Sequence, residues 1–189
     1  MIAECPLCHF KMTVCREIPE RCLACGNTKK PDAFVPWWRK VAIAIRRVCK
    51  NQMFFGGNFF AHILPQASHW IFWDKNMTMP TFGDGELIWT SFKRNSVKKE
   101  FFQFNGLISD SADKREHPTQ KPSELVRRLI RNYTEPGQIV IDPFCGVGTT
   151  PLACEREGRF WVAVEREQKY CSISRDRIEA EAAQGKLFI

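Results

Sequence analysis

The sequence contains no apolar run near the ~20 residues that a helix needs to cross a bilayer. It also lacks, at its beginning, the basic segment followed by an apolar segment that marks a secretory signal peptide. These two absences predict a cytoplasmic protein. The 189 residues, 44% of them hydrophobic and 26% charged, are typical of a globular chain with one core and at most a small appendage.

The charge balance and the cysteines narrow the class further. The net charge of +7 favours polyanionic partners, because neutralising phosphates releases counterions, although solubility alone explains such a charge as well. Four of the nine cysteines form two CxxC pairs. In a chain without an export signal, such pairs indicate a metal site rather than disulfides.

The two CxxC pairs predict a four-cysteine zinc ribbon over residues 1–30. They are separated by 13 residues, and four thiolates suit tetrahedral Zn²⁺. The segment is too short for a core of its own, so a metal would supply its folding energy. A redox dithiol, incidental cysteines and substitution by His9 or Cys15 remain alternatives. The expected ligands are Cys5, Cys8, Cys22 and Cys25.

The role of such a ribbon is less determined than its metal. Ribbons bind nucleic acid, bind protein or only brace a fold. Basic residues in this segment favour nucleic acid, and they are Lys11, Arg16, Arg21, Lys29 and Lys30.

A strand, a glycine turn and a helix follow one another in the stretch QIVIDPFCGVGTT. The consecutive β-branched residues Ile139–Ile141 are typical of a buried parallel strand. Gly146 and Gly148 then allow a sharp turn and a close approach of a ligand to the backbone. Thr149 or Thr150 is expected to cap the following helix.

A second strand and an acid complete this pattern. After a break at Gly158, residues 160–164 predict a strand, and Glu165 follows it, 19 positions after Gly146. A carboxylate there can accept hydrogen bonds from both ribose hydroxyls of a nucleoside. Pro151 stands where a dinucleotide fingerprint has its third glycine, which argues against a dinucleotide. A plain tight turn remains the alternative to a ligand site.

Two of these strings resemble motifs of a known family. DPFCGVGTT resembles motif I of the S-adenosylmethionine (SAM)-dependent DNA amino-methyltransferases, and HPTQKP, beginning at His117, resembles their motif X. In the β subclass of these enzymes, motif X precedes motif I by about this distance. The resemblance implies an α/β, Rossmann-like SAM-dependent methyltransferase fold over residues 31–189, after the zinc ribbon.

The resemblance also implies which residues bind the cofactor. Glu165 would hold the ribose, and Thr119 with Lys121 would lie at the methionine end. The backbone N–H groups at the start of a helix over residues 123–133 would face the cofactor carboxylate, and Thr119 or Gln120 would cap that helix. The remaining residues expected around SAM are Asp142, Phe144, Gly146 and Gly148.

The middle of the chain extends the likeness to residues 37–178. KNQMFFGGNFF, HWIFWDK and GELIWTSFK resemble segments of phage-type DNA adenine methyltransferases. The patterns predict helices over 37–49, 123–133 and 168–183, and strands over 51–55, 69–73, 86–92 and 101–104. In the loop 93–116, basic residues alternate with phenylalanines, which suits either a DNA-facing surface or the core side of a strand.

One expected motif is missing. The family's catalytic loop is an Asp, Asn or Ser followed by Pro-Pro and an aromatic residue, which positions the target amine and stacks on the flipped base. This sequence has no Pro-Pro pair, and the two CxxC pairs stand where that loop is expected. Three explanations remain: a second polypeptide supplies the loop, the chain is a degenerate or truncated relative, or unrecognised residues do its work. We therefore assign no catalytic residue from the sequence.

The resemblance as a whole predicts a DNA amino-methyltransferase. The enzyme would act on double-stranded DNA, with adenine N6 favoured over cytosine N4 as the acceptor. The main alternative is a non-catalytic zinc-ribbon DNA-binding protein, or a partner subunit on a methyltransferase scaffold. Methylation of RNA or of a small molecule is a third hypothesis, which leaves the middle segments unexplained.

Overall fold

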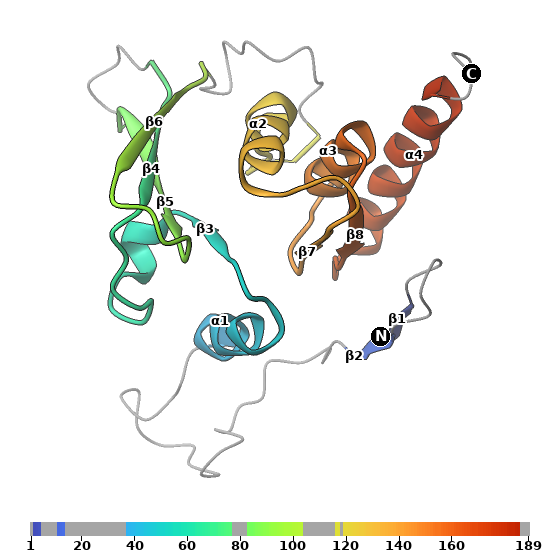
Figure 1. Ribbon diagram of the computed structural model, residues 1–189. Helices are drawn as coiled ribbons and strands as arrows, with labels where there is room; N and C mark the ends of the chain where they lie inside the picture. The colour runs from blue at the N-terminus through green and yellow to red at the C-terminus, as the bar shows by residue number, and fades with distance from the viewer. Residues whose placement is uncertain are drawn as a thin grey trace, which may run out of the picture. The chain divides into compact units, whose positions relative to one another are not determined.

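The computed structural model describes residues 2–4, 11–13, 37–76, 83–103, 116–117 and 119–185 (Figure 1). These residues fall into two compact units, Met1–Val14 with Gly106–Ile189 and Cys15–Asn105. The first unit begins with a short antiparallel pair, β1 (Ile2–Glu4) and β2 (Lys11–Thr13). No helix in the described ranges is long and apolar enough to cross a membrane.

The described residues of the second unit form one helix, one 3-10 turn and a four-stranded sheet. The sheet order is β3-β5-β4-β6, and the neighbours are antiparallel except for the parallel pair β4 and β6. The predicted helix and the first three predicted strands are confirmed, with ends that differ by at most two residues. The elements are α1 (Trp37–Val48), β3 (Met53–Phe55), η2 (Gly57–Phe60), β4 (Trp70–Asp74), β5 (Gly85–Thr90) and β6 (Val97–Phe101).

The prediction of the fourth strand was wrong. We expected it over residues 101–104, but β6 spans Val97–Phe101 and pairs with the whole of β4. The first three residues of β6, Val97, Lys98 and Lys99, have exposed side chains. Charged side chains are common on edge strands, because they discourage pairing with another chain. The apolar pattern that identifies a buried strand is therefore absent here.

The core of this sheet consists of β4 and β5 side chains. Ile71, Trp73, Ile88 and Trp89 are almost fully buried. The indole N–H of Trp73 donates to the carbonyl of Phe102 at 2.9 Å, so the chain after β6 is fastened to β4. Phe102 is itself a core residue, whereas half of Phe101 is exposed. The core interpretation is therefore confirmed for Phe102, and the DNA-facing interpretation stays a prediction for Phe101.

The first unit contains a parallel strand–helix–strand arrangement. Strands β7 and β8 pair in parallel, with Ile139 opposite Phe160 and Asp142 opposite Ala163, and α3 is the crossover between them. Figure 1 shows α3 between α2 and α4, and α3 is the helix that packs on the two strands. The elements are α2 (Ser123–Tyr133), β7 (Ile139–Asp142), α3 (Thr149–Glu157), β8 (Phe160–Ala163) and α4 (Gln168–Gly185).

Helix α2 packs on α3 through an apolar face and an ion-pair cluster. Leu125, Val126, Leu129 and Ile130 are buried. Glu157 at the end of α3 accepts hydrogen bonds from Arg131 at 2.7 and 2.9 Å and from Arg127 at 3.0 Å. The hydrogen bonds from Arg131 and Arg127 hold the pKa of Glu157 below its usual value. The two arginines are therefore structural cations of this interface.

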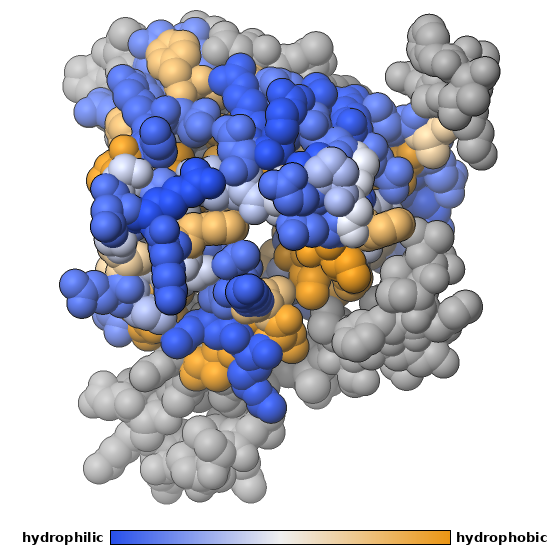
Figure 2. Space-filling view, viewed as in Figure 1, coloured by the Kyte–Doolittle hydropathy of each residue, from blue (hydrophilic) through white to orange (hydrophobic). Residues whose placement is uncertain are grey.

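One face of the β7–β8 pair carries apolar side chains that are exposed among the described residues of this unit. Ile139 and Phe160, which are opposite each other, are 64% and 56% exposed, and Ile141 is 37% exposed. Trp161 on the neighbouring position donates its indole N–H to Glu155 of α3, so the opposite face carries the helix. Figure 2 shows apolar surface where Figure 1 draws these two strands. In doubly wound sheets both faces are normally covered.

The predicted helix caps are corrected by the structure. Helix α3 is capped by Gly148, not by Thr149 or Thr150, and no side chain caps it. Helix α2 is capped by Pro122, not by Thr119 or Gln120, again without a side-chain hydrogen bond. These polar side chains make other contacts instead, described below.

Candidate functional site

The turn after β7 is shaped by two glycines in the left-handed conformation. Gly146 has φ 54° and Gly148 has φ 78°, and residues with a β-carbon rarely adopt such angles. The Gly148 N–H donates to the carbonyl of Cys145 at 2.9 Å, and the Cys145 N–H donates to Val164 at 3.0 Å. A β-carbon on Gly146 would meet no atom within 4 Å, so space lies open beside this part of the turn.

Asp142 fastens the turn to α3. One carboxylate oxygen accepts from the Phe144 N–H at 2.9 Å, and the other accepts from the Thr150 hydroxyl at 2.5 Å. Burial raises the pKa of the Asp142 carboxyl, while these two hydrogen bonds act in the opposite direction. Thr150 thus supports the predicted site residue Asp142 rather than capping the helix.

Glu165 reaches back from the end of β8 to the same turn. Its Oε2 accepts from the Gly146 N–H at 3.0 Å, and its Oε1 accepts from the N–H groups of Arg166 and Glu167 at 2.7 and 2.8 Å. A carboxylate has about four lone-pair positions, so capacity for a further donor remains. The acid predicted 19 positions after Gly146 therefore does lie against it.

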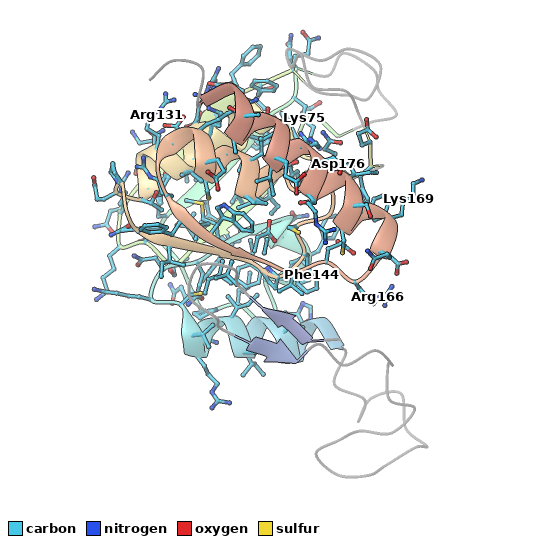
Figure 3. The ribbon with its side chains drawn as sticks, turned by 90° about the vertical axis from the view of Figure 1, so that its right-hand side faces the viewer. Lys75, Arg131, Phe144, Arg166, Lys169 and Asp176 are labelled. Carbon is cyan, nitrogen blue, oxygen red and sulfur yellow. The ribbon has the colours of Figure 1, made fainter. Side chains whose placement is uncertain are left out.

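Phe144 is the exposed member of the turn. Its side chain is 55% exposed, although the backbone beside it is held by Asp142. Figure 3 shows Phe144 and Arg166 at the same end of this unit, near the first turn of α4. A half-exposed aromatic ring beside an open turn is a suitable surface for stacking a planar ligand.

The thiol in the turn is not a nucleophile. Burial raises the pKa of Cys145 to about 12, and the nearby carboxylates of Asp142 and Glu165 act in the same direction. The thiolate, which is the reactive form, is therefore scarce at neutral pH.

The segment resembling motif X forms a compact turn before α2. The Thr119 N–H donates to His117 Nδ1 at 3.1 Å, and the Gln120 N–H donates to the His117 carbonyl at 3.1 Å. Gln120 is buried, and its side-chain oxygen accepts from the Glu116 N–H at 2.8 Å. Thr119 remains exposed and Lys121 half-buried at the start of α2, whereas Pro118 lies outside the described residues.

Helix α4 connects the two predicted parts of the site. The His117 ring meets the edge of the Tyr170 ring, with centroids 4.4 Å apart. One residue later, the Cys171 thiol donates to the Glu165 carbonyl at 3.4 Å. The motif X segment and the strand-end acid Glu165, separate in sequence, therefore contact neighbouring residues of one helix.

Three contacts of this site were not predicted from the sequence. Thr150 binds Asp142, Ser174 packs under Gly148, and Arg177 donates to the carbonyl of Val147 at 2.7 Å. Ser174 and Arg177 follow Cys171 at helical spacing, which places all three on one face of α4. This helical spacing was the signal in the sequence that Ser174 and Arg177 share a helix face. The spacing alone does not reveal which segment packs on that face.

The predicted zinc ligands lie outside the described residues. This applies to Cys5, Cys8, Cys22 and Cys25, and to the alternative ligands His9 and Cys15. In the part of the chain that the structure describes, no group of three or more His, Cys, Asp or Glu side chains could hold a metal ion.

Comparison with known proteins identifies the family. Residues 72–176, which begin within β4 and include the motif X turn, the glycine turn and the first half of α4, match the DNA methylase family of N6 and N4 methyltransferases. The chain belongs to this family. The match covers more than half of the 189 residues and includes both candidate cofactor segments.

Curated relatives of this DNA methylase chain are type II methyltransferases. The chain is 27% identical over 190 residues to the type II methyltransferase M.HinfI of Haemophilus influenzae, covering 78% of this chain and 51% of that protein. It is 45% identical over 65 residues to M2.DpnII of Streptococcus pneumoniae, covering 34% and 24%. The chain therefore spans about half the length of the first of these relatives, and less of the second.

Solved structures support the fold of this family member. A crystal structure of M1.HpyAVI with SAM superposes with a TM-score of 0.53 at 23% identity, covering 68% of this chain and 74% of that one. A second structure of M1.HpyAVI gives the same TM-score at 20% identity, with coverages of 77% and 83%. The α/β methyltransferase fold is thus confirmed for the matched part.

Proposed function

We propose that this chain is the SAM-binding part of a DNA amino-methyltransferase that modifies double-stranded DNA. The methyl group would pass directly to the exocyclic amine of a flipped base, with adenine N6 favoured over cytosine N4. The supporting observation is the hydrogen bond between Glu165 and Gly146, which joins a strand-end acid to a left-handed glycine turn. Its family and the names of its relatives agree with this activity.

The residues around the turn fit SAM. Open space beside Gly146 gives a ligand access to the backbone, and Glu165 retains acceptor capacity for a ribose hydroxyl. Phe144 offers an exposed ring to the adenine, and Asp142 holds the turn between them. Gly148 completes the turn against α4.

The methionine end of SAM would lie at the motif X turn. Thr119 is exposed there, and Lys121 adds a cation near the start of α2. The first N–H groups of that helix have no side-chain cap, so they suit a carboxylate. When bound, SAM supplies a methyl group on a sulfonium that an amine can attack. The chain's own residues bind and orient it.

No residue of this chain is assigned to catalysis, and a second polypeptide would supply the missing loop. The sequence has no Pro-Pro pair, so none of its recognised motifs would position the target amine. The exposed apolar face at Ile139, Ile141 and Phe160 supports this proposal, because a helix of a second polypeptide could be buried there.

The N-terminal segment would be a zinc ribbon over residues 1–30, followed by the methyltransferase-like domain over 31–189. The proposal rests on the spacing of Cys5, Cys8, Cys22 and Cys25. Zinc would be structural, and the ribbon a further contact for DNA.

The second candidate function is a non-catalytic DNA-binding partner subunit, which the absence of the Pro-Pro motif favours. Transfer of labelled methyl groups from SAM to unmethylated genomic DNA separates the two candidates. The zinc-loaded chain is tested alone and with a polypeptide that carries an Asp-Pro-Pro-aromatic loop. Methyladenine or methylcytosine in the digested product supports the enzyme. Failure of transfer in both samples, with SAM bound, favours the partner subunit.

A further inference from the structure

Helix α4 contacts every predicted segment of the cofactor site from one face. Tyr170 meets His117 of the motif X turn, and Cys171 donates to the carbonyl of Glu165. Further along, Ser174 and Arg177 contact the glycine turn. Tyr170, Ser174 and Arg177 are four and three residues apart, which is the spacing of one helix face, and Cys171 lies beside that face.

Ser174 and Gly148 are in close approach. Ser174 is only 7% exposed, and a β-carbon at Gly148 would lie 2.1 Å from its hydroxyl oxygen and 2.9 Å from its β-carbon. No real side chain tolerates such distances. The turn therefore packs directly on α4, and the side chain of Ser174 sets the distance between Gly148 and the helix.

Arg177 fixes the orientation of the peptide in the middle of the turn. Its Nη1 donates to the Val147 carbonyl at 2.7 Å, between the two left-handed glycines. Glycine offers little resistance to rotation of its backbone, so a peptide flanked by two glycines needs an external constraint. A hydrogen bond from a charged donor is stronger than a neutral one and supplies that constraint.

We infer that Arg177 is a positioning residue for the cofactor, with Ser174 as its support, because together they hold the Gly146–Gly148 turn in the conformation that accepts SAM. This inference rests on the proposed cofactor. Arg177 contacts the turn from α4, and it would act on the cofactor through the Val147 carbonyl. Figure 3 shows Asp176, its neighbour on α4, well away from Phe144.

The test compares two arginines of the same helix. Arg177→Met keeps the aliphatic stem and removes the donor, Arg177→Lys restores one charged donor, and Arg175→Met makes the same change at an exposed position. SAM affinity is measured by calorimetry, with the thermal midpoint of the free proteins as a check on folding. We expect Arg177→Met to bind SAM roughly 10- to 100-fold more weakly, the range for a lost charge-assisted hydrogen bond. Arg177→Lys should recover most of the affinity, and Arg175→Met should bind as the unchanged protein does.

Equal SAM affinity of Arg177→Met and Arg175→Met, with both folded, overturns the inference. If Arg177→Met does not fold, Ser174→Thr takes its place, since the added methyl group presses on Gly148 and should weaken SAM binding. Unchanged affinity of Ser174→Thr then overturns the inference.

Failure of the proposed cofactor is recognised separately, because the unchanged protein would then not bind SAM. In that case amide hydrogen exchange tests the positioning role without a ligand. Arg177→Met should speed exchange at Val147 and Gly148 relative to Arg175→Met, at an unchanged global midpoint. Equal exchange rates overturn the inference.

Discussion

The Glu165 carboxylate accepts a hydrogen bond from the Gly146 N–H at 3.0 Å, which ties the end of β8 to the turn after β7. The other oxygen of Glu165 holds two N–H groups of its own loop. The acid thus organises both sides of the proposed ribose site before any ligand binds.

Replacing Glu165 should weaken cofactor binding. We expect Glu165→Ala to bind SAM roughly 10- to 100-fold more weakly, since three charge-assisted hydrogen bonds and the ribose acceptor are lost. S-adenosylhomocysteine should lose affinity by the same factor, because it has the same ribose. Glu167→Ala is the control, since the side chain of Glu167 is exposed and bonds only to Arg166 among the described contacts. Calorimetry measures all three proteins, and equal affinities for SAM would count against the assigned role of Glu165.

Gly148 should be intolerant of a β-carbon for two separable reasons. Its left-handed φ of 78° costs alanine about 1–2 kcal/mol, and the overlap with Ser174 adds about 1–3 kcal/mol. Gly137 has φ 79°, and a β-carbon added there would meet nothing within 4 Å, so Gly137→Ala reports the backbone cost alone. Urea unfolding should give a larger loss of stability for Gly148→Ala. Equal losses would mean that the turn can rise away from α4.

The sequence predicted the elements of the unit that contains α2 to α4 best where proline or glycine residues mark the ends of a periodic apolar pattern. Pro122 and the Pro136-Gly137 turn enclose α2, whose bounds were predicted without error. Thr150 and Ser174 were missed for a different reason. A helix-capping pattern cannot tell whether a glycine already occupies the cap, and a helix face cannot name its partner, because both depend on tertiary placement. Strand β6 was predicted at the wrong residues because its exposed lysines replace the alternating apolar residues that identify a strand.

The Glu157 cluster should make stability depend on acid pH. Hydrogen bonds from Arg131 and Arg127 lower the pKa of Glu157, so its contribution is complete above the unfolded value of about 4.3 and is lost as pH falls through the lowered folded value. Glu157→Gln should therefore cost about 1–3 kcal/mol at pH 7, and this difference should shrink below pH ~4. Glu179→Gln, at an exposed position of α4, is the control. Urea unfolding across pH 3–7 checks the effect, and a pH-independent difference would exclude the ion pairs as its source.

The N-terminal cysteines should hold one zinc ion. We expect about one equivalent of zinc per chain by plasma mass spectrometry, in line with a four-thiolate site. Cys22→Ser should lose it, whereas Cys15→Ser, between the two CxxC pairs, should retain it. Zinc retained by Cys22→Ser and lost by Cys15→Ser would assign the site to a different ligand set.

The turn between β7 and α3 is the proposed SAM site. Isothermal titration of SAM into the purified zinc-loaded chain measures this binding. We expect saturable binding of one SAM per chain, with competition by S-adenosylhomocysteine and no competition by a dinucleotide such as NAD. Absence of saturable binding in a folded chain would overturn the assignment, since the turn, Glu165 and the motif X segment would then lack their proposed ligand.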